Sequence, residues 1–325
     1  MNKLLLSQAI WSNEIPTGNL LWVDGVNGND SLAVRGRLTV PFKTLAAAKN
    51  AAVAGDTIIV MPGTYVISDN LAKNNVHWHF IQGAKMQGGA FKLDSAITTR
   101  ISGELELLAS PGPAVEVTHA SAGLHLKCRR LYGTYAGVKV TAGSAYVEAD
   151  SIESDEQPGV DVSGGTLHLR ARSVYSDQTH GVSITGGTLN LEAYSVSSNS
   201  GKGLYFTGGT AVVTAVEIYS NTAEGVEYNS AYSNALTLRH ARVASKATPT
   251  SGNFKAGLLI VNGTGNLRLM NCCFIMANNG AASAYSIHTT GGGATVLLSG
   301  YNTGNANKHP SVTLTPNIFS YDANL

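Results

Sequence analysis

The chain has 325 residues, of which 43% are hydrophobic and only 13% are charged, and its formal net charge is +1. This balance gives no electrostatic basis for nucleic acid or an anionic membrane surface as a partner, and we expect neither. The three cysteines, Cys128 and the adjacent pair Cys272 and Cys273, supply no disulfide framework.

The first residues read MNKLLLSQAIWSNE, an apolar run that is interrupted soon after Lys3. This segment lacks the length and the cleavage site of a secretory signal, and no stretch of the chain is long and apolar enough to insert into a membrane. We therefore expect synthesis in the cytosol, followed by placement on a virion or another extracellular surface.

Residues 1–55 are predicted to form an N-terminal extension that ends in a capping helix. The stretch from Leu45 to Ala54 is rich in alanine and is followed by Gly55, a residue at which helices commonly end. Residues 57–60 are typical of a first strand, and Pro62-Gly63 is typical of a turn. A helix laid over the first coil would protect the open edge of a stack of parallel strands.

A repeat dominates the middle of the chain, where glycine recurs at an interval of 22 residues: Gly137, Gly159, Gly181, Gly203 and Gly225. Apolar positions alternate within each copy, which is typical of short strands with one buried face. Glycine pairs such as Gly186-Gly187 mark the corners. Three short strands and no helix per copy predict an all-β, single-stranded parallel β-helix over residues 56–300, in which each coil buries its apolar face against its neighbours.

The last segment, residues 301–325, loses the repeat and contains Pro310 and Pro316. An open solenoid end is a pairing hazard, so this segment is predicted to form a C-terminal cap or an oligomer contact. We expect the protein to form a homo-oligomer, a trimer, or to contact other virion proteins.

The N-terminal part contains a series of short motifs: Asp24, Gly28-Asn29-Asp30, Pro41-Phe42-Lys43-Thr44, Gly55-Asp56-Thr57-Ile58 and Pro62-Gly63-Thr64-Tyr65. This series resembles the start of right-handed parallel β-helix proteins of the pectate-lyase-like superfamily, which includes polysaccharide lyases, glycoside hydrolases, epimerases, bacteriophage tailspikes and non-enzymatic surface proteins. The resemblance implies a right-handed solenoid but no particular reaction. Within the series, Asp56 is expected to fix the turn into the first strand.

An acidic stretch is the strongest candidate for paired catalytic carboxylates, which glycoside hydrolysis requires: Glu148, Asp150, Glu153, Asp155, Glu156 and Asp161. The 22-residue register places a base one coil away from several of these acids, as in the pairs Glu148 and Arg170, Asp150 and Arg172, and Asp161 and Lys139. We interpret these acids as members of surface ladders in which acids face bases.

A second column contains only aspartate and asparagine: Asp155, Asp177, Asn199 and Asn221. Such side chains at a turn cap backbone groups and hydrogen-bond along the stack, so we predict a structural role for Asn199 and Asn221. Two aspartates one coil apart would also repel each other and raise one pKa. If the protein is an enzyme, Asp155, Asp177 and Glu156 are the first candidate catalytic acids.

Four tyrosines form the candidate ligand-binding surface. Tyr175 and Tyr219 share one column, Tyr194 lies on the preceding turn, and Tyr205 lies on another strand. A sugar ring can stack on aromatic side chains of this kind, so a surface polysaccharide is the expected ligand.

The histidines give weaker signals. His77 and His79 share one face of a strand, but two histidines without a third ligand make a poor metal site, and we expect no metal or other cofactor. The remaining histidines, including His125 and His168, look dispersed and suggest no Ser-His-Asp arrangement.

Two functions are consistent with these observations. The first is a non-catalytic structural or adhesive β-helix, part of a phage tail or capsid, that binds a surface glycan or a partner protein. The alternative is a carbohydrate-active enzyme, either a polysaccharide lyase or a glycoside hydrolase of the tailspike type. Acids that pair with bases across neighbouring coils favour the first function, whereas an unpaired acid pair on an exposed sheet would favour the second.

Overall fold

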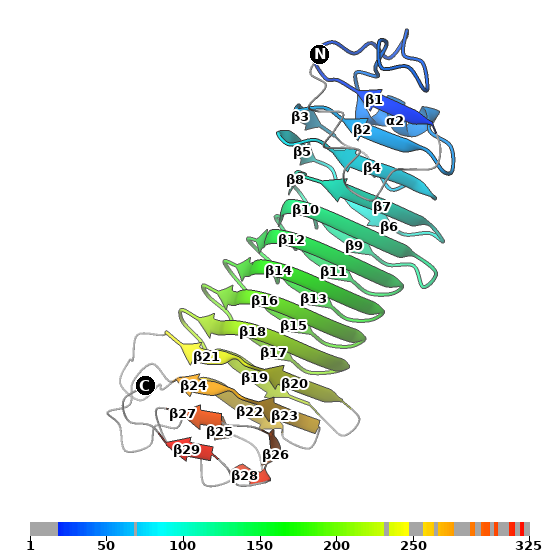
Figure 1. Cartoon of the computed structure of the whole chain (residues 1–325). Helices are drawn as coiled ribbons and strands as arrows, with labels where there is room; N and C mark the ends of the chain where they lie inside the picture. The colour runs from blue at the N-terminus through cyan, green and yellow to red at the C-terminus, as the bar shows by residue number, and fades with distance from the viewer. Residues whose placement is uncertain are drawn as a thin grey trace.

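The computed structural model describes residues 19–67, 70–230, 234–246, 256–262 and 266–275, together with the strands at 287–289, 294–299, 302–304, 312–315 and 319–321. This part of the chain is an all-β solenoid whose coils stack in sequence order from the N-terminal to the C-terminal end, as Figure 1 shows. Every strand pairing within it is parallel, so the predicted parallel β-helix is confirmed.

The solenoid wall consists of two sheets. The larger sheet contains 20 of the described strands. They are β1 (Leu20–Val23), β2 (Thr57–Val60), β3 (Gly63–Val66), β4 (Val76–Phe80), β5 (Ala84–Gly88), β7 (Thr98–Gly103), β8 (Glu106–Ala109), β10 (Gly123–Gly133), β12 (Ser144–Ser154), β14 (Thr166–Ser176), β16 (Thr188–Ser198), β18 (Thr210–Ser220), β20 (Ala235–Arg239), β21 (Arg242–Ser245), β23 (Asn266–Met270), β24 (Cys273–Ile275), β26 (Ala294–Ser299), β27 (Asn302–Gly304), β28 (Val312–Thr315) and β29 (Phe319–Tyr321).

The smaller sheet contains nine of the described strands, most of them only three residues long. They are β6 (Phe91–Leu93), β9 (Val115–Val117), β11 (Val138–Val140), β13 (Val160–Val162), β15 (Val182–Ile184), β17 (Leu204–Phe206), β19 (Val226–Asn229), β22 (Leu258–Asn262) and β25 (Ile287–Thr289).

The three short strands predicted for each coil are present, but two of them merge in the regular part of the solenoid. In β12, for example, pairing with the next coil stops at Ala149 and resumes at Ser151, so one strand of 11 residues bends where the prediction placed a break. In the coil that follows β18 the two halves separate into β20 and β21. The outward side chains before and after the bend therefore lie on two differently oriented faces.

The glycines that recur every 22 residues lie where one coil approaches the next most closely. A Cβ atom added at any of the five would lie less than 3.0 Å from a carbonyl oxygen of the next coil, which is closer than real contacts allow. The corner glycines have a different role, because Gly165, Gly187 and Gly209 adopt φ values of +65°, +67° and +79°. That left-handed backbone conformation strains residues with side chains, as the corner prediction required.

The predicted capping helix is present as α2 (Leu45–Ala51), next to β1 and β2 at the N-terminal end of the solenoid (Figure 1). Thr44 caps its N-terminus by accepting a hydrogen bond from the backbone N–H of Ala47 at 3.1 Å. Leu45 and Ala48 are buried and belong to the solenoid core. The amphipathic helix thus covers apolar side chains of the first coil; the part of the predicted extension at residues 1–18 lies outside the described residues.

Asp56 lies at the turn between α2 and β2, and its side chain is only 1% exposed. Its carboxylate accepts two hydrogen bonds from the Arg35 guanidinium, at 2.7 and 2.5 Å, and others from the backbone N–H groups of Val53 and Asn19. Burial by itself raises the pKa of Asp56, but these hydrogen bonds together hold it below its usual value. The buried carboxylate therefore ties the N-terminal loop and the helix to the first strand.

The core is a continuous column of apolar side chains between the two sheets. Aromatic rings fill it at two levels: Trp78, Phe80 and Phe91 contact one another in the N-terminal coils, and Phe206 stacks on Tyr228 further along. At the C-terminal end, strands β27, β28 and β29 continue the larger sheet. The remaining residues of the predicted segment 301–325 lie outside the described part, so its role as a cap or an oligomer contact stays a prediction.

Candidate functional site

Two columns of outward side chains run along the first half of the long strands, on the outer face of the larger sheet. Because the strands pair in parallel and in register, each column takes one residue from each coil. The ring column contains His125, Tyr146, His168 and Asn190, and the charged column contains Lys127, Glu148, Arg170, Glu192, Thr214 and Arg239. Side chains alternate across a strand, so the two columns lie side by side on one face.

In the ring column, His125, Tyr146 and His168 stack on one another. The ring centroids of His125 and Tyr146 are 5.5 Å apart and those of Tyr146 and His168 are 5.4 Å apart, with interplanar angles of 9° and 20°. Asn190 Nδ2 extends the column by a 3.4 Å contact to His168 Nδ1. Tyr146 is 54% exposed, so its ring edge and hydroxyl face the solvent although its ring faces are covered.

The charged column begins with two ion pairs between neighbouring coils. Lys127 Nζ lies 3.0 Å from Glu148 Oε1, and the guanidinium of Arg170 donates two hydrogen bonds to Glu192 Oε2, at 3.0 and 2.8 Å. The side chains of Arg170 and Glu192 are 69% and 63% exposed, so the pair contributes little to stability. Its effect at this surface is to hold both charges in place beside the ring column.

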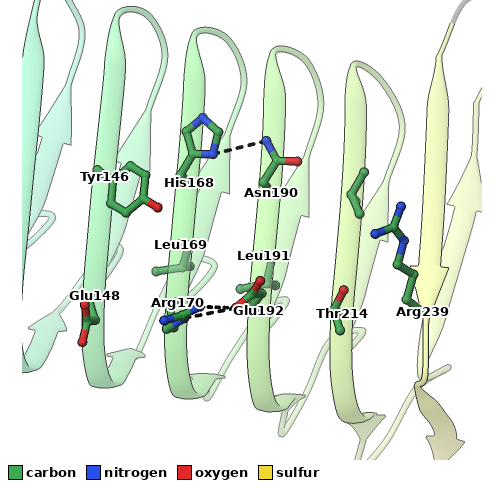
Figure 2. A pocket seen from close by; sticks show the side chains of 11 residues that line it. Tyr146, Glu148, His168, Leu169, Arg170, Asn190, Leu191, Glu192, Thr214 and Arg239 are labelled. Atoms are coloured by element: carbon green, nitrogen blue, oxygen red, sulfur yellow. Dashed lines mark hydrogen bonds and ion pairs between the residues drawn. The ribbon is translucent and has the colours of Figure 1, made fainter.

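A groove of about 310 Å³ lies between the two columns. Figure 2 shows Tyr146, His168 and Asn190 along one side, Glu148, Arg170, Glu192 and Thr214 along the other, and Arg239 at one end, leaning toward the neighbouring strand. The groove offers hydroxyl, amide, imidazole and guanidinium groups to a ligand that lies along the solenoid axis. The predicted ligand-binding tyrosines do not line this groove, which the sequence did not predict.

The aspartate and asparagine column forms a hydrogen-bonded stack. Asn199 Nδ2 donates to Asp177 Oδ1 at 3.0 Å, and Asn221 Nδ2 donates to Asn199 Oδ1 at 3.3 Å. Asp155 accepts a hydrogen bond from the Tyr132 hydroxyl, and Asp177 accepts one from the Tyr175 hydroxyl at 3.0 Å. The candidate acids Asp155 and Asp177 are therefore occupied by neighbouring hydroxyl and amide groups.

Glu156, the third candidate acid, is exposed at the turn next to this stack. Its backbone N–H donates to the carbonyl oxygen of Thr134 at 2.9 Å, which is a contact of the turn. A role for Asp155, Asp177 or Glu156 in catalysis stays an untested prediction.

The four tyrosines predicted to bind a ligand do not share one surface. Tyr175 and Tyr219 lie in one column beyond the bend, separated by the buried Ser197. Lys246 Nζ lies 3.2 Å from the centroid of the Tyr219 ring and covers that face. Tyr194 is 59% exposed and lies at the bend, between the two faces of the larger sheet.

Tyr205 lies on the smaller sheet, where its ring packs against His180 with the centroids 4.6 Å apart. His180 Nδ1 accepts a hydrogen bond from the backbone N–H of Lys202 at 3.1 Å. Burial, and then the charge of Lys202, lower the pKa of His180 to about 4, so the imidazole is neutral at pH 7. Tyr205 is therefore part of a packed cluster rather than a free stacking platform.

Two acids of the predicted ladders, Glu148 and Glu153, pair with bases of neighbouring coils, whereas the pairing between β12 and β14 is interrupted at Asp150 and Arg172. Glu148 and Arg170 are cross-strand neighbours as predicted, although the ion pair of Glu148 is with Lys127. Glu153 accepts hydrogen bonds from Arg130 at 3.2 and 2.5 Å.

Within the described part of the chain, Asp161 does not form the predicted ion pair with Lys139. It lies beside Lys139 in the predicted register, but the amine of Lys139 lies 3.6 Å from Glu116. Burial raises the pKa of Asp161, and the charge of Lys139 only partly opposes this shift. A cavity of about 270 Å³ is lined by these three residues together with Pro113, Tyr135, Ala136 and Gln157.

The histidines are less dispersed than the sequence suggested. His125 and His168 share the ring column, because the coil between His125 and Tyr146 has 21 residues rather than 22. His77 Nε2 and His79 Nδ1 lie 2.7 and 2.9 Å from Ser102 Oγ, which is buried. Among the described residues, no three His, Cys, Asp or Glu side chains gather in a way that would hold a metal ion.

Comparison with known proteins identifies the solenoid. A family described as "Right handed beta helix region" matches residues 113–274. The match covers the regular coils from β9 to β23, which are therefore similar to right-handed β-helices. Both the ring column from His125 onward and the charged column lie within the β-helix region. No curated protein and no solved structure matches the chain. In the part of the chain that the structure describes, no helix has the length and apolar character that a membrane span needs.

Proposed function

We propose that this protein is a non-catalytic structural and adhesive β-helix that binds an extended polysaccharide in the groove between the ring column and the charged column. The observation that carries the proposal is that hydrogen-bonding side chains repeat along the solenoid axis, one per coil. Tyr146, Asn190 and Thr214 provide neutral polar groups, and Arg239 provides a cation. Coils of a parallel sheet are about 4.8 Å apart, which is close to the length that one pyranose ring adds to an extended chain.

The carboxylates of the groove support binding without cleavage. Glycoside hydrolysis needs one carboxyl group that donates a proton and a second that acts as base or nucleophile. The groove contains Glu148 and Glu192, and each accepts an ion pair from a base of the preceding coil. Both carboxylates are thus engaged by a base of the chain itself, which leaves neither free to act as the base or the nucleophile toward a ligand.

Binding to a panel of immobilised neutral and acidic polysaccharides tests the proposal. Tyr146→Ala removes the central ring of the column and is expected to weaken binding about threefold to tenfold. Tyr194→Ala is the matched control, because Tyr194 is similarly exposed but does not line the groove. Equal loss in both variants, or no binding by the wild type to any polysaccharide, would contradict the proposed function.

Product analysis on the same panel tests the non-catalytic part of the proposal. We expect no new reducing ends and no unsaturated products, with or without Ca²⁺. Depolymerisation that disappears in Asp155→Asn or Asp177→Asn would overturn this expectation and place an active site at the turn next to the asparagine stack.

A second candidate function, a carbohydrate-active enzyme, is favoured by one observation on the smaller sheet. Asp161 lines a cavity beside Lys139 and Glu116, and burial raises its pKa, as is typical of a carboxyl group that donates a proton. Cleavage that is abolished by Asp161→Asn but unaffected by Tyr146→Ala would favour this function over the first.

Assembly as a homo-oligomer, a trimer, and placement on a virion or an extracellular surface remain parts of the proposal. Sedimentation equilibrium of the full chain measures the oligomeric state directly. A monomer at all concentrations would contradict the predicted assembly, whereas it would leave the proposed groove intact.

A further inference from the structure

The charged column changes its character at Thr214. From the N-terminal end it reads Lys127, Glu148, Arg170, Glu192, Thr214 and Arg239, with one residue from each successive strand. The first four residues alternate in sign and form two ion pairs. The next position, Thr214, is uncharged, so Arg239 follows it in the column without an acid directly before it.

Arg239 consequently lacks a carboxylate among its column neighbours. The carboxylate of Glu192 accepts both of its short hydrogen bonds from Arg170, and the next residue beyond Arg239 in the column is Met270. Arg239 is exposed and makes no hydrogen bond or ion pair with the described part of the chain. The structure thus leaves an unneutralised guanidinium at the end of the groove.

The space beside Arg239 is open. Thr214, Val212 and Arg239 line the same end of the groove, and in Figure 2 the side chain of Arg239 extends toward the strand that carries Thr214. Arg268 lies on the next strand, in the column of Thr237, and adds a second exposed cation nearby. A planar guanidinium that faces free space next to a hydroxyl is well suited to bind an oxyanion through two parallel hydrogen bonds.

We propose that an oxyanion on the ligand binds beside Arg239 and supplies the negative charge that this base lacks in the column. The ligand group is a carboxylate, sulfate or phosphate substituent; Arg239 donates the charge-assisted hydrogen bonds, and Thr214 donates one from its hydroxyl. This inference rests on the proposed function, since it assigns the anionic substituent of the polysaccharide that the groove binds. It also gives the groove a direction, because the anion lies at the end nearest β20.

Polysaccharides that share one sugar backbone and differ only in their charged substituents test the proposal. Dextran, carboxymethyl dextran, dextran sulfate and dextran phosphate are compared at constant ionic strength and at equal degrees of substitution. We expect at least one anionic derivative to bind about tenfold to hundredfold more tightly than neutral dextran, since charge-assisted hydrogen bonds are the strong class. The anionic arms also show which oxyanion is preferred. Equal binding of neutral and anionic polymers would refute the anion position and leave the proposed groove intact.

Three variants separate a specific contact from general attraction. Arg239→Gln is expected to abolish the preference for the anionic polymer, measured as the ratio of its Kd to that of neutral dextran in the same variant. Thr214→Glu supplies a carboxylate beside Arg239 from the chain itself, so it is expected to abolish the same preference. Arg172→Gln is the control, because it removes an equal charge from an exposed residue of the larger sheet that does not line the groove. Equal losses in Arg239→Gln and Arg172→Gln would refute the proposal.

A small-anion titration keeps the two proposals distinguishable. If no dextran derivative binds, the polymer assay contradicts the proposed function for polysaccharides with a dextran backbone. The anion position is then tested separately, by following the Nε–H NMR resonances of labelled arginines during addition of sodium sulfate. A saturable shift of one resonance that is missing in Arg239→Gln supports the anion position. A uniform, non-saturable drift of all arginine resonances refutes it.

Discussion

The close approach of neighbouring coils at Gly203 gives a quantitative prediction. A Cβ atom at this position would lie 2.7 Å from the carbonyl oxygen of Tyr219 and 2.8 Å from that of Gly225. Both oxygens belong to the backbone of the next coil, so neither moves without disturbing the parallel pairing. Overpacking of this kind costs about 1–3 kcal/mol. For a chain of 325 residues this free energy corresponds to a fall of about 1–4 °C in the thermal midpoint.

Gly123→Ala is the matched control for Gly203→Ala. Its added Cβ would meet only side-chain atoms of Thr98, the nearest at 3.3 Å, and the equivalent positions of the next coils hold Ser144 and Thr166. Alanine at position 123 should therefore be neutral or slightly stabilising. Thermal unfolding of both variants, followed by far-UV circular dichroism, measures the difference. If Gly203→Ala unfolds at the wild-type temperature, the close approach of the coils is not the reason for glycine at this position.

Three further predictions concern other residues. His180 has a pKa of about 4 in the folded state, against 6.5 when exposed, so its contribution to the free energy of unfolding is complete above pH 6.5 and is lost as the pH falls toward 4. Urea unfolding should show that the free energy of unfolding falls on the order of 1–2 kcal/mol between pH 7 and pH 5 in the wild type and not in His180→Gln. An identical pH dependence of the two proteins would contradict the assignment. Asn199→Ala removes two hydrogen bonds of the amide stack and should lower the free energy of unfolding by about 1–2 kcal/mol. Ser200→Ala, at an exposed position next to it, should leave the free energy of unfolding almost unchanged. Equal thermal midpoints of the two variants would show that the stack is not stabilising. Arg35→Ala removes the hydrogen bonds that keep the pKa of Asp56 low, so acid unfolding should begin at a higher pH than in the wild type, and an unchanged acid transition would argue against this role.

The fold was accessible from the sequence because the repeat encodes the register directly. A 22-residue interval between glycines aligns the same position of each coil, and parallel pairing then follows for every column, as at Val182 and Leu204. The merging of two predicted strands was not accessible. It depends on whether the backbone can bend without losing its pairing, and at Asp150 only one position of the ladder is interrupted.

The groove was missed for a different physical reason. Tyr146, His168 and Asn190 follow the 22-residue interval and were in principle visible, but His125 precedes Tyr146 by 21 residues, so a fixed interval does not align it. The tyrosines near the turns were the more visible aromatic signal in the sequence, but they do not line the groove. Side-chain contacts decide whether such a ring is free, and Lys246 covers the face of Tyr219.

Stacking in register makes the coil the unit in which this surface can change. Each coil contributes one residue to the ring column and one to the charged column, and its glycine fits only against the backbone of a complete neighbour. Insertion or loss of a few residues inside a strand would shift every column beyond that point, because the side chains of a strand alternate between faces. Duplication of one whole coil would instead preserve all columns and lengthen the groove by one step. If the groove binds an extended polymer, the length of polymer that it contacts therefore changes in steps of one whole coil.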